Sequence, residues 1–333
     1  MKNMLKTYSL ILLLILSYSS RAQSKNEEPA FEKTKSLTKS YPFTGSDMLK
    51  IDNRFGDVKV NLWDKAEVKV EIQMSGKANT EELAQDLIDR ITIEEGKSGS
   101  TVNFKTKIVD KKTPVTKGQK YVHTRFSINY TIFMPSQNAL YIENEFGKVS
   151  VPDYKGEITI KQKFGQLTAG RLSNVKKILV EFSNGTVIES VNGGDLEFKF
   201  SRSQVNRMEG VVNVSVEHSG GVKLMADNSL KKLNITNAFT QLYLDVPTNL
   251  SASYKVHTNF SELNNKSSFG IKEEIEEDRR GPKFDHDYNG QSGNGNIPVK
   301  INSEFGEVTI GHNMQFDVNA KEEKKAKART RAV

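Results

Sequence analysis

Acidic residues and one histidine gather near the C-terminus and could bind a divalent cation. Six residues make up this group: Glu276, Glu277, Asp278, Asp285, His286 and Asp287. Carboxylate oxygens are the hard ligands that Ca²⁺ and Mg²⁺ prefer. Acid-rich surface loops are also common in proteins that bind no metal, so the sequence does not decide the question. Asp285, His286 and Asp287 are the candidate metal ligands.

Other chemistry has little support in the sequence. The chain contains no cysteine, which excludes cysteine nucleophiles and disulfides. It contains no G-x-S-x-G elbow, Walker loop, H-E-x-x-H motif or dinucleotide fingerprint. The stretch "GQSGNGN" (290–296) is superficially like a phosphate-binding loop, but it lacks a Lys and a following helix signature. We therefore predict no catalytic residue and no cofactor.

The first residues are typical of a secretory signal peptide. Lys2 and Lys6 precede the apolar run "LILLLIL" (10–16), and Ser20 and Ala22 form a small-x-small cleavage pattern. The run is too short to span a bilayer, and no later segment approaches the required length. Without cysteine, the mature chain has no site for an N-terminal lipid. We expect an exported protein of the periplasm or cell surface that is not a lipoprotein.

The net charge of +7 does not mark a nucleic-acid-binding protein. The signal segment carries +3 and residues 321–333 carry +4, so the body between them is neutral. Nucleic-acid binding requires a basic footprint on the folded surface. The sequence therefore predicts no nucleic-acid partner, and a solvated basic tail at 314–333.

One short phrase recurs along the chain. "IENEFGKVSV" (142–151) has near-copies at 51–60 and 301–310, and weaker copies follow at spacings of 18 and then 21 residues. The central ring residues of the nine copies are Phe55, Phe146, Phe164, Phe182, Phe200, His218, Phe239, Phe260 and Phe305. An aliphatic residue stands four positions before each ring, and Gly, Ser or Thr stands one position after it.

This repeat predicts an all-β fold, a single-chain β-solenoid with coils of 18–21 residues. Positions four apart on a strand face the same side. We therefore expect the aliphatic residue and the ring, His218 included, to point into the core. The small residue after the ring would let the chain turn a corner.

Charges in the column before the ring alternate in sign. Glu145, Lys163, Glu181, Lys199 and Glu217 follow one another at the repeat spacing. Stacking in register would place each charge beside an opposite one, and like charges there would be destabilising. An ion-binding stripe would need a single sign. The column therefore predicts a register-setting ladder of ion pairs.

Three segments depart from the repeat. Residues 23–44, after the signal peptide (1–22), are polar and predict a flexible leader. Within 45–137, which begins with the first copy, residues 79–91 have helical spacing, and 100–109 and 125–134 alternate as two strands. We interpret these as a helix and hairpin that cap the first coil. The solenoid would run over 138–313, interrupted by a long charged loop at 266–297.

The "ENEFGKVSV" copies, the helix-bearing insert and "INSEFGEVTI" after a Gly-rich loop resemble one known family. It is the family of exported bacterial adhesin-like proteins of unknown function, close to the head-domain adhesin-like proteins of auto-transporters. The resemblance covers about residues 45–312. It implies a right-handed β-solenoid and a cell-envelope location, and it transfers no site residues. His218 and the basic tail depart from the family pattern.

Three functions are compatible with these observations. The first is a non-enzymatic envelope or surface protein that presents an extended face to a glycan, a cell-surface protein or itself. The second is a β-helix carbohydrate-active enzyme, which would need carboxylates and a basic residue converging from consecutive coils. The third is a structural or signalling accessory of the periplasm. The alternating charges favour the first.

Overall fold

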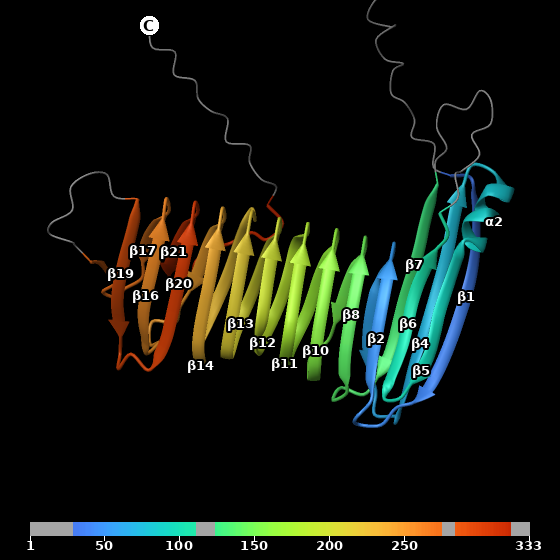
Figure 1. The fold of residues 1–333 in the computed structure, drawn as a ribbon, viewed down its shortest axis with the longest axis horizontal. Helices are drawn as coiled ribbons and strands as arrows, with labels where there is room; N and C mark the ends of the chain where they lie inside the picture. Colours follow the sequence, from blue (N-terminus) through green and yellow to red (C-terminus); the bar gives the residue numbers. More distant parts are fainter. Residues whose placement is uncertain (1–28, 111–123, 275–283, 321–333) are drawn as a thin grey trace, which may run out of the picture.

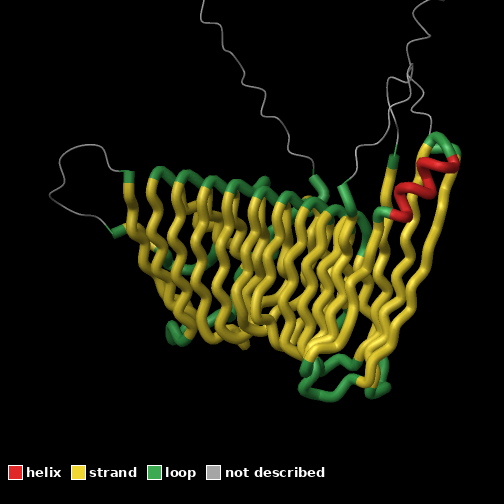
Figure 2. Tube along the Cα trace, turned by 45° about the vertical axis from the view of Figure 1, so that its right-hand side comes forward, coloured by secondary structure: helices red, strands yellow, loops and turns green. Residues whose placement is uncertain are grey.

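The computed structural model describes residues 29–110, 124–274 and 284–320 (Figure 1). The predicted signal peptide and most of the basic tail lie outside these residues. The described chain is all-β, with a large, mostly parallel sheet of 21 strands that does not close and one helix at its N-terminal end. Figure 2 shows the strands side by side along the length of the body. The prediction of an all-β chain is confirmed at this level.

The N-terminal part comprises one helix and seven strands: β1 (Phe31–Pro42), β2 (Met48–Arg54), β3 (Val58–Leu62), β4 (Glu67–Ala78), α2 (Glu81–Asp89), β5 (Ile91–Ser98), β6 (Thr101–Ile108) and β7 (Arg125–Met134). The middle comprises β8 (Ala139–Glu145), β9 (Lys148–Val151), β10 (Tyr154–Lys163), β11 (Gln166–Glu181), β12 (Asn184–Lys199), β13 (Arg202–Glu217), β14 (Gly221–Ala238) and β15 (Gln241–Asp245). The C-terminal part comprises β16 (Ala252–Asn259), β17 (Glu262–Lys266), β18 (Lys272–Glu273), β19 (Asp285–Ser292), β20 (Ile297–Glu304) and β21 (Glu307–Gly311).

The aliphatic column of the repeat forms a continuous buried row. Parallel pairing places Ile142, Ile160 and Ile178 on consecutive strands β8, β10 and β11. The full row, in spatial order, is Ile51, Ile142, Ile160, Ile178, Leu196, Val214, Ile235, Ile301 and Val256. All nine side chains are buried. Burial of each contributes about 1.5–3 kcal/mol, so this predicted column is confirmed as a main element of the core.

The spatial order of the strands differs from their order in the sequence. β20 pairs in parallel with β14 on one side and with β16 on the other. β21 lies in the same way between β15 and β17. Figure 1 shows β20 between β14 and β16. The last copy of the repeat therefore lies between two earlier copies.

The ring column does not point into the core, and this part of the prediction was wrong. All nine ring residues have φ between 46° and 61°. Residues in this left-handed conformation interrupt the alternation of a strand, so the side chain that should face inward faces solvent. Seven of the Phe residues are 42–52 % exposed: Phe146, Phe164, Phe182, Phe200, Phe239, Phe260 and Phe305. His218 is exposed as well, and the small residue after each ring occupies the inner side of the corner.

The corner uses one of two hydrogen-bonding arrangements. In one, an amide two positions before the ring lies beneath the corner, as Gln162 Nε2 donates to the Gly147 carbonyl at 2.9 Å. Gly165 leaves room for that amide. In the next repeat the position two before the ring is Val180, and the hydroxyl of Ser183 donates to the Gly165 carbonyl instead.

Gly165→Ser should destabilise the protein by about 2–4 kcal/mol, through overpacking and loss of the buried amide bond. A Cβ at Gly165 would lie 2.6 Å from Gln162 Nε2 and 1.8 Å from the Gly147 carbonyl oxygen. Adding Gln162→Val supplies the side chains of the Val180–Ser183 repeat and removes the clash with the amide, so it should recover part of the loss, while the contact with the Gly147 carbonyl remains. Urea unfolding of both variants measures this. A single variant as stable as the wild type would contradict the assignment.

The predicted N-terminal elements form, but they pair differently. Residues 31–42 of the expected flexible leader are β1, which pairs with β4 over its whole length. The expected helix is α2, with Thr80 Oγ1 accepting from the Leu83 N–H at 3.2 Å. The two expected strands are β6 and β7, yet they do not form a hairpin together. β6 pairs in parallel with β2, whose other neighbour is β8. β7 pairs in parallel with β3, whose other neighbour is β9.

The C-terminal segments also carry more structure than the sequence predicts. Within the expected loop 266–297, β19 pairs antiparallel with all of β16, and β18 pairs antiparallel with β19. Residues 312–320, named here the C-terminal strap, pack back on the body. Phe316 lies 4.3 Å from the Arg202 guanidinium, measured to the ring centroid, and Arg202 Nε donates to the Asp317 carbonyl at 2.6 Å.

A buried ion pair anchors the C-terminal strap. Lys223 Nζ lies 3.0 Å from Asp245 Oδ2, and the two side chains are 9 % and 5 % exposed. Asp245 also accepts from the backbone N–H groups of Asn313 and Met314, each at 2.9 Å. The Lys223 ammonium donates to the Met314 carbonyl. One buried carboxylate therefore holds both a lysine and the start of the strap.

Candidate functional site

The outward rings stack into a continuous row, named here the aromatic ladder. In spatial order its members are Phe126, Phe55, Phe146, Phe164, Phe182, Phe200, His218, Phe239, Phe305, Phe260 and Phe284. From Phe55 to Phe260 the ring centroids are 4.7–5.2 Å apart, and neighbouring planes differ by 2–9°. The spacing is that of neighbouring strands, so the body itself sets the stack. His218 lies within it, stacked between Phe200 and Phe239.

The stack determines which part of each ring solvent can reach. Between Phe55 and Phe260 every ring face is covered by the next ring, so the exposed half of each side chain is its edge. The ladder is therefore a narrow, flat, apolar stripe of ring edges. It does not offer an open ring face on which a sugar could lie.

The ladder is held at an energetic cost. Left-handed backbone costs roughly 1–2 kcal/mol for a residue other than Gly, and Phe gains nothing locally to offset it, unlike Asn or Asp. Each stacked pair contributes about 0.5–1.5 kcal/mol beyond the burial of the covered ring area. The stacking gain is therefore similar in size to the backbone cost, and burial of the covered half of each ring adds to it. What the arrangement achieves is the outward display of the rings.

One flank of the ladder carries the predicted ion pairs, named here the charge row. Its members are Arg54, Glu145, Lys163, Glu181, Lys199 and Glu217. Lys163 Nζ lies 2.8 Å from Glu181 Oε2, and Lys199 Nζ lies 3.4 Å from Glu217 Oε2. The hydrogen bond with Glu181 raises the pKa of Lys163 above its ordinary value. The predicted alternation is confirmed, and Arg54 extends it by pairing with Glu145 at 2.8 Å.

The residues expected to bind a metal do not converge. Asp285, His286 and Asp287 alternate along β19, so the middle side chain lies on the opposite face from the other two. His286 Nδ1 is 2.7 Å from Glu273 Oε1, while Asp287 Oδ1 is 2.8 Å from His257 Nδ1. Among the described residues, no group of three or more His, Asp or Glu side chains is placed to hold a metal ion.

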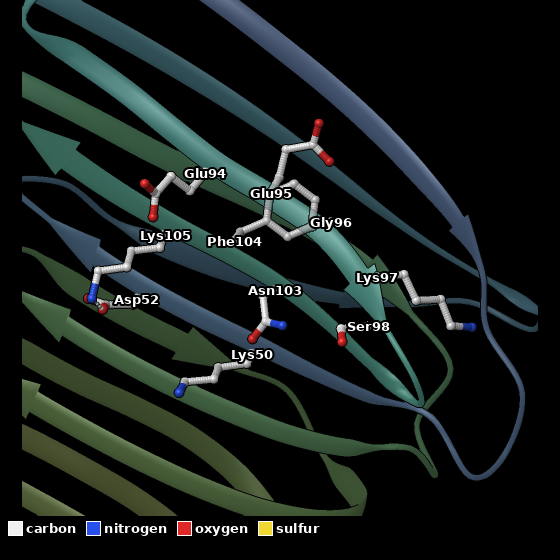
Figure 3. Close-up of a pocket in the computed structure, with 10 residues that line it drawn as sticks. All are labelled: Lys50, Asp52, Glu94, Glu95, Gly96, Lys97, Ser98, Asn103, Phe104 and Lys105. Carbon is white, nitrogen blue, oxygen red and sulfur yellow. Dashed lines mark ion pairs between the residues drawn. The ribbon is translucent and has the colours of Figure 1, made fainter.

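A shallow hollow of about 370 Å³ lies beside β2, β5 and β6 (Figure 3). Two of its lysines form ion pairs. Lys105 Nζ is 2.7 Å from Asp52 Oδ2, and Lys97 Nζ is 2.9 Å from Asp47 Oδ2. Figure 3 shows Glu95 and Lys97 pointing away from the Lys105–Asp52 pair.

Comparisons with known proteins give distant structural neighbours. No protein-family model matches the chain, and no curated protein matches its sequence. A candidate adhesin from Bacteroides fragilis aligns with 83 % of this chain and 97 % of its own, with TM-score 0.43 and 11 % identity. A candidate cell adhesion protein from Clostridium sporogenes covers 84 % and 100 %, with TM-score 0.23 and 14 % identity. A candidate adhesin from Parabacteroides distasonis covers 83 % and 97 %, with TM-score 0.32 and 11 % identity.

In the part of the chain that the structure describes, no helix is long and apolar enough to cross a membrane.

Sequence reasoning found nine of the eleven members of the ladder but missed Phe126, Phe284 and the exposure of the rings. The available signal for exposure was the residue after each of the nine repeat rings, which is always Gly, Ser or Thr. A column of small residues marks the crowded inner side of a corner, and it leaves the outer side to the ring.

Proposed function

We propose that this chain is a non-enzymatic, adhesin-like protein of the cell envelope whose aromatic ladder binds another macromolecule. The scaffold is a right-handed β-solenoid with coils of 18–21 residues. Its regular spacing carries the rings outward along one edge. Export by the N-terminal signal places it in the periplasm or on the surface. The proposal includes no catalytic step, cofactor or nucleic-acid partner.

The observation that carries this proposal is the repeated left-handed ring. Backbone strain of this kind is usually kept where it serves a function, because Gly or Asn would relieve it. Here it recurs at nine positions and produces a long exposed apolar stripe. Exposed apolar patches of this extent mark interaction surfaces.

The distribution of carboxylates supports binding rather than hydrolysis. Hydrolysis of glycosidic bonds needs two carboxylates placed across an open groove. In the charge row, Glu145, Glu181 and Glu217 each lie beside a cationic side chain. Carboxylates held in this way are poor candidates for acid–base chemistry.

A binding experiment with a matched control tests the function. Fluorescently labelled wild-type protein should bind intact cells of the producing organism and fragments of their envelope. Phe182→Asn/Phe200→Asn removes two rings and keeps residues that tolerate the left-handed backbone, and it should lower binding at least tenfold. Phe31 is 43 % exposed and lies outside the ladder, so Phe31→Asn should bind as the wild type does.

Two results would contradict the proposal. One is equal binding by the wild type and the ladder variant. The other is a change in the mass of envelope polysaccharides after incubation with the protein, since that would show an enzyme.

A further inference from the structure

We infer that the aromatic ladder is a self-association surface, on which two molecules of this chain meet ladder against ladder. The molecules run antiparallel about a two-fold axis that passes between Phe182 and Phe200. The inference rests on the proposed function and deepens it, because it names the binding partner as a second molecule of the same chain. Four features of the ladder support it: area, shape, charge and register.

The exposed apolar area matches what a dimer requires. A Phe side chain offers about 150–250 Å². Seven ladder Phe residues between Phe146 and Phe260 are close to half exposed. Together they present roughly 700 Å², and Phe55, His218 and the flanking stems bring the stripe to about the 800 Å² that each partner buries in a standard interface. The largest apolar patch of an ordinary monomer is about 300–600 Å².

The shape of the stripe favours a partner that is itself flat and regular. The ring edges lie at the strand spacing over nine consecutive positions, from Phe55 to Phe260. A second ladder has the same width, length and spacing. A glycan would need open ring faces, and the stack covers them.

The charge row is complementary to its own reverse. A two-fold axis across the ladder, in the plane of contact, brings the same flank of both molecules together and reverses the direction of one. With the axis between Phe182 and Phe200, Glu181 faces the partner's Lys199 and Lys163 faces the partner's Glu217. Farther out, Glu145 faces the partner's neutral Ala238, and Arg54 faces the partner's Glu304, which continues the same column beyond the charge row. The three pairs in which both residues are charged are of opposite charge.

The alternating charges also determine which residues of the two molecules lie opposite each other in the dimer. Moving the axis by half a repeat, onto Phe182, would place Lys163 opposite the partner's Lys199 and Glu145 opposite the partner's Glu217. Like charges so placed cost free energy. An axis between two rings is therefore favoured over an axis on a ring. The axis between Phe182 and Phe200 also brings eight stacked rings, from Phe55 to Phe305, opposite the partner's.

Sedimentation velocity of the mature chain tests self-association. We expect a dimer whose population rises with concentration between micromolar and submillimolar protein. Each ring at the centre of the interface should account for about tenfold in affinity. Phe182→Asn/Phe200→Asn should therefore weaken dimerisation about 100-fold, and Phe31→Asn should leave it unchanged. Circular dichroism checks that each variant is folded.

A charge reversal gives a second, independent variant. Lys199→Glu keeps every ring but places an acid opposite the partner's Glu181. It should weaken the dimer about tenfold, and added salt should reduce the difference from the wild type.

The absence of cysteine makes crosslinking specific. Arg54 and Glu304 lie on strands seven positions apart in the row, about 34 Å at the usual strand spacing. They cannot form a disulfide within one molecule. In the proposed dimer each faces the other across the interface. Arg54→Cys/Glu304→Cys should give a covalent dimer on mild oxidation, and Arg54→Cys alone should not.

The outcomes separate this inference from the proposed function. A wild type that stays monomeric, a dimer that survives loss of both rings, or no crosslink in the double-cysteine variant would overturn the inference. If the wild type is monomeric while the ladder variant loses binding to a glycan array or to cells, the function stands with a different partner. If the dimer forms and no envelope binding occurs, the inference stands and the ladder binds only its own copy, so the adhesin-like role in the envelope is contradicted.

Discussion

Ile178→Asp should prevent folding of the body, with a loss of more than about 5 kcal/mol, whereas Phe182→Asp should cost at most about 3 kcal/mol. Ile178 is fully buried in the aliphatic row, between Ile160 and Leu196 on neighbouring strands. An ionised carboxylate there has no partner and no water. Phe182 is 48 % exposed and loses only its two stacking contacts, and Asp tolerates its left-handed backbone.

Expression yield, circular dichroism and urea unfolding of the two variants measure this difference. Both variants carry the same substitution, at positions four residues apart: Ile178 lies on β11 and Phe182 lies at the corner that follows β11. The comparison therefore isolates the direction in which the side chain points. Similar losses from both variants would show that the ring column is part of the core after all.

Lys223→Ala should destabilise the protein by about 3–5 kcal/mol, because it leaves the Asp245 carboxylate buried without its cation. The two N–H donors from the C-terminal strap, on Asn313 and Met314, do not neutralise that charge. The strap also loses the bond from the Lys223 ammonium to the Met314 carbonyl. We therefore expect the strap to detach before the rest of the chain unfolds.

Lys199→Ala is the matched control for this prediction. Lys199 is also a strand lysine paired with an acid, but the Lys199–Glu217 pair is exposed to solvent. Its loss should change the free energy of unfolding by no more than about 1 kcal/mol. Urea unfolding of the two variants under the same conditions gives the comparison, and equal effects would contradict the buried role of Lys223.

The sequence contained enough information for the core but not for the corners. The column from Ile142 to Val214 repeats at 18 residues, and parallel pairing at that register buries it as predicted. The prediction for the ring column was wrong because it assumed that the alternation of the strand continues as far as the ring residue, where the left-handed backbone ends it. Val180 still faces inward, but the left-handed backbone at Phe182 turns the ring outward and gives the inner position to Ser183. Phe has no intrinsic preference for that conformation, so residue type alone does not predict it.

The order of the repeats in space could not be predicted from the sequence either. Local patterns identify Ile297–Glu304 as a strand, but its two neighbours are chosen by packing between distant segments. The same holds for β6 and β7, whose alternation was recognised and whose partners were not. The candidate site shares this division. Nine of its rings and its alternating charges follow from the repeat spacing, while the exposure of the rings follows from the corner geometry.

The place of β20 and β21 has a consequence for the timing of folding. A chain that emerges N-terminus first makes β14 and β16 before the strand that separates them exists. Until residues 297–311 arrive, two strand edges with matching hydrogen-bonding groups stand unpaired, and they can join each other or a neighbouring chain. We therefore expect the body to close only at the end of synthesis, and chains truncated before Ile297 to aggregate rather than fold into a shorter version of the protein.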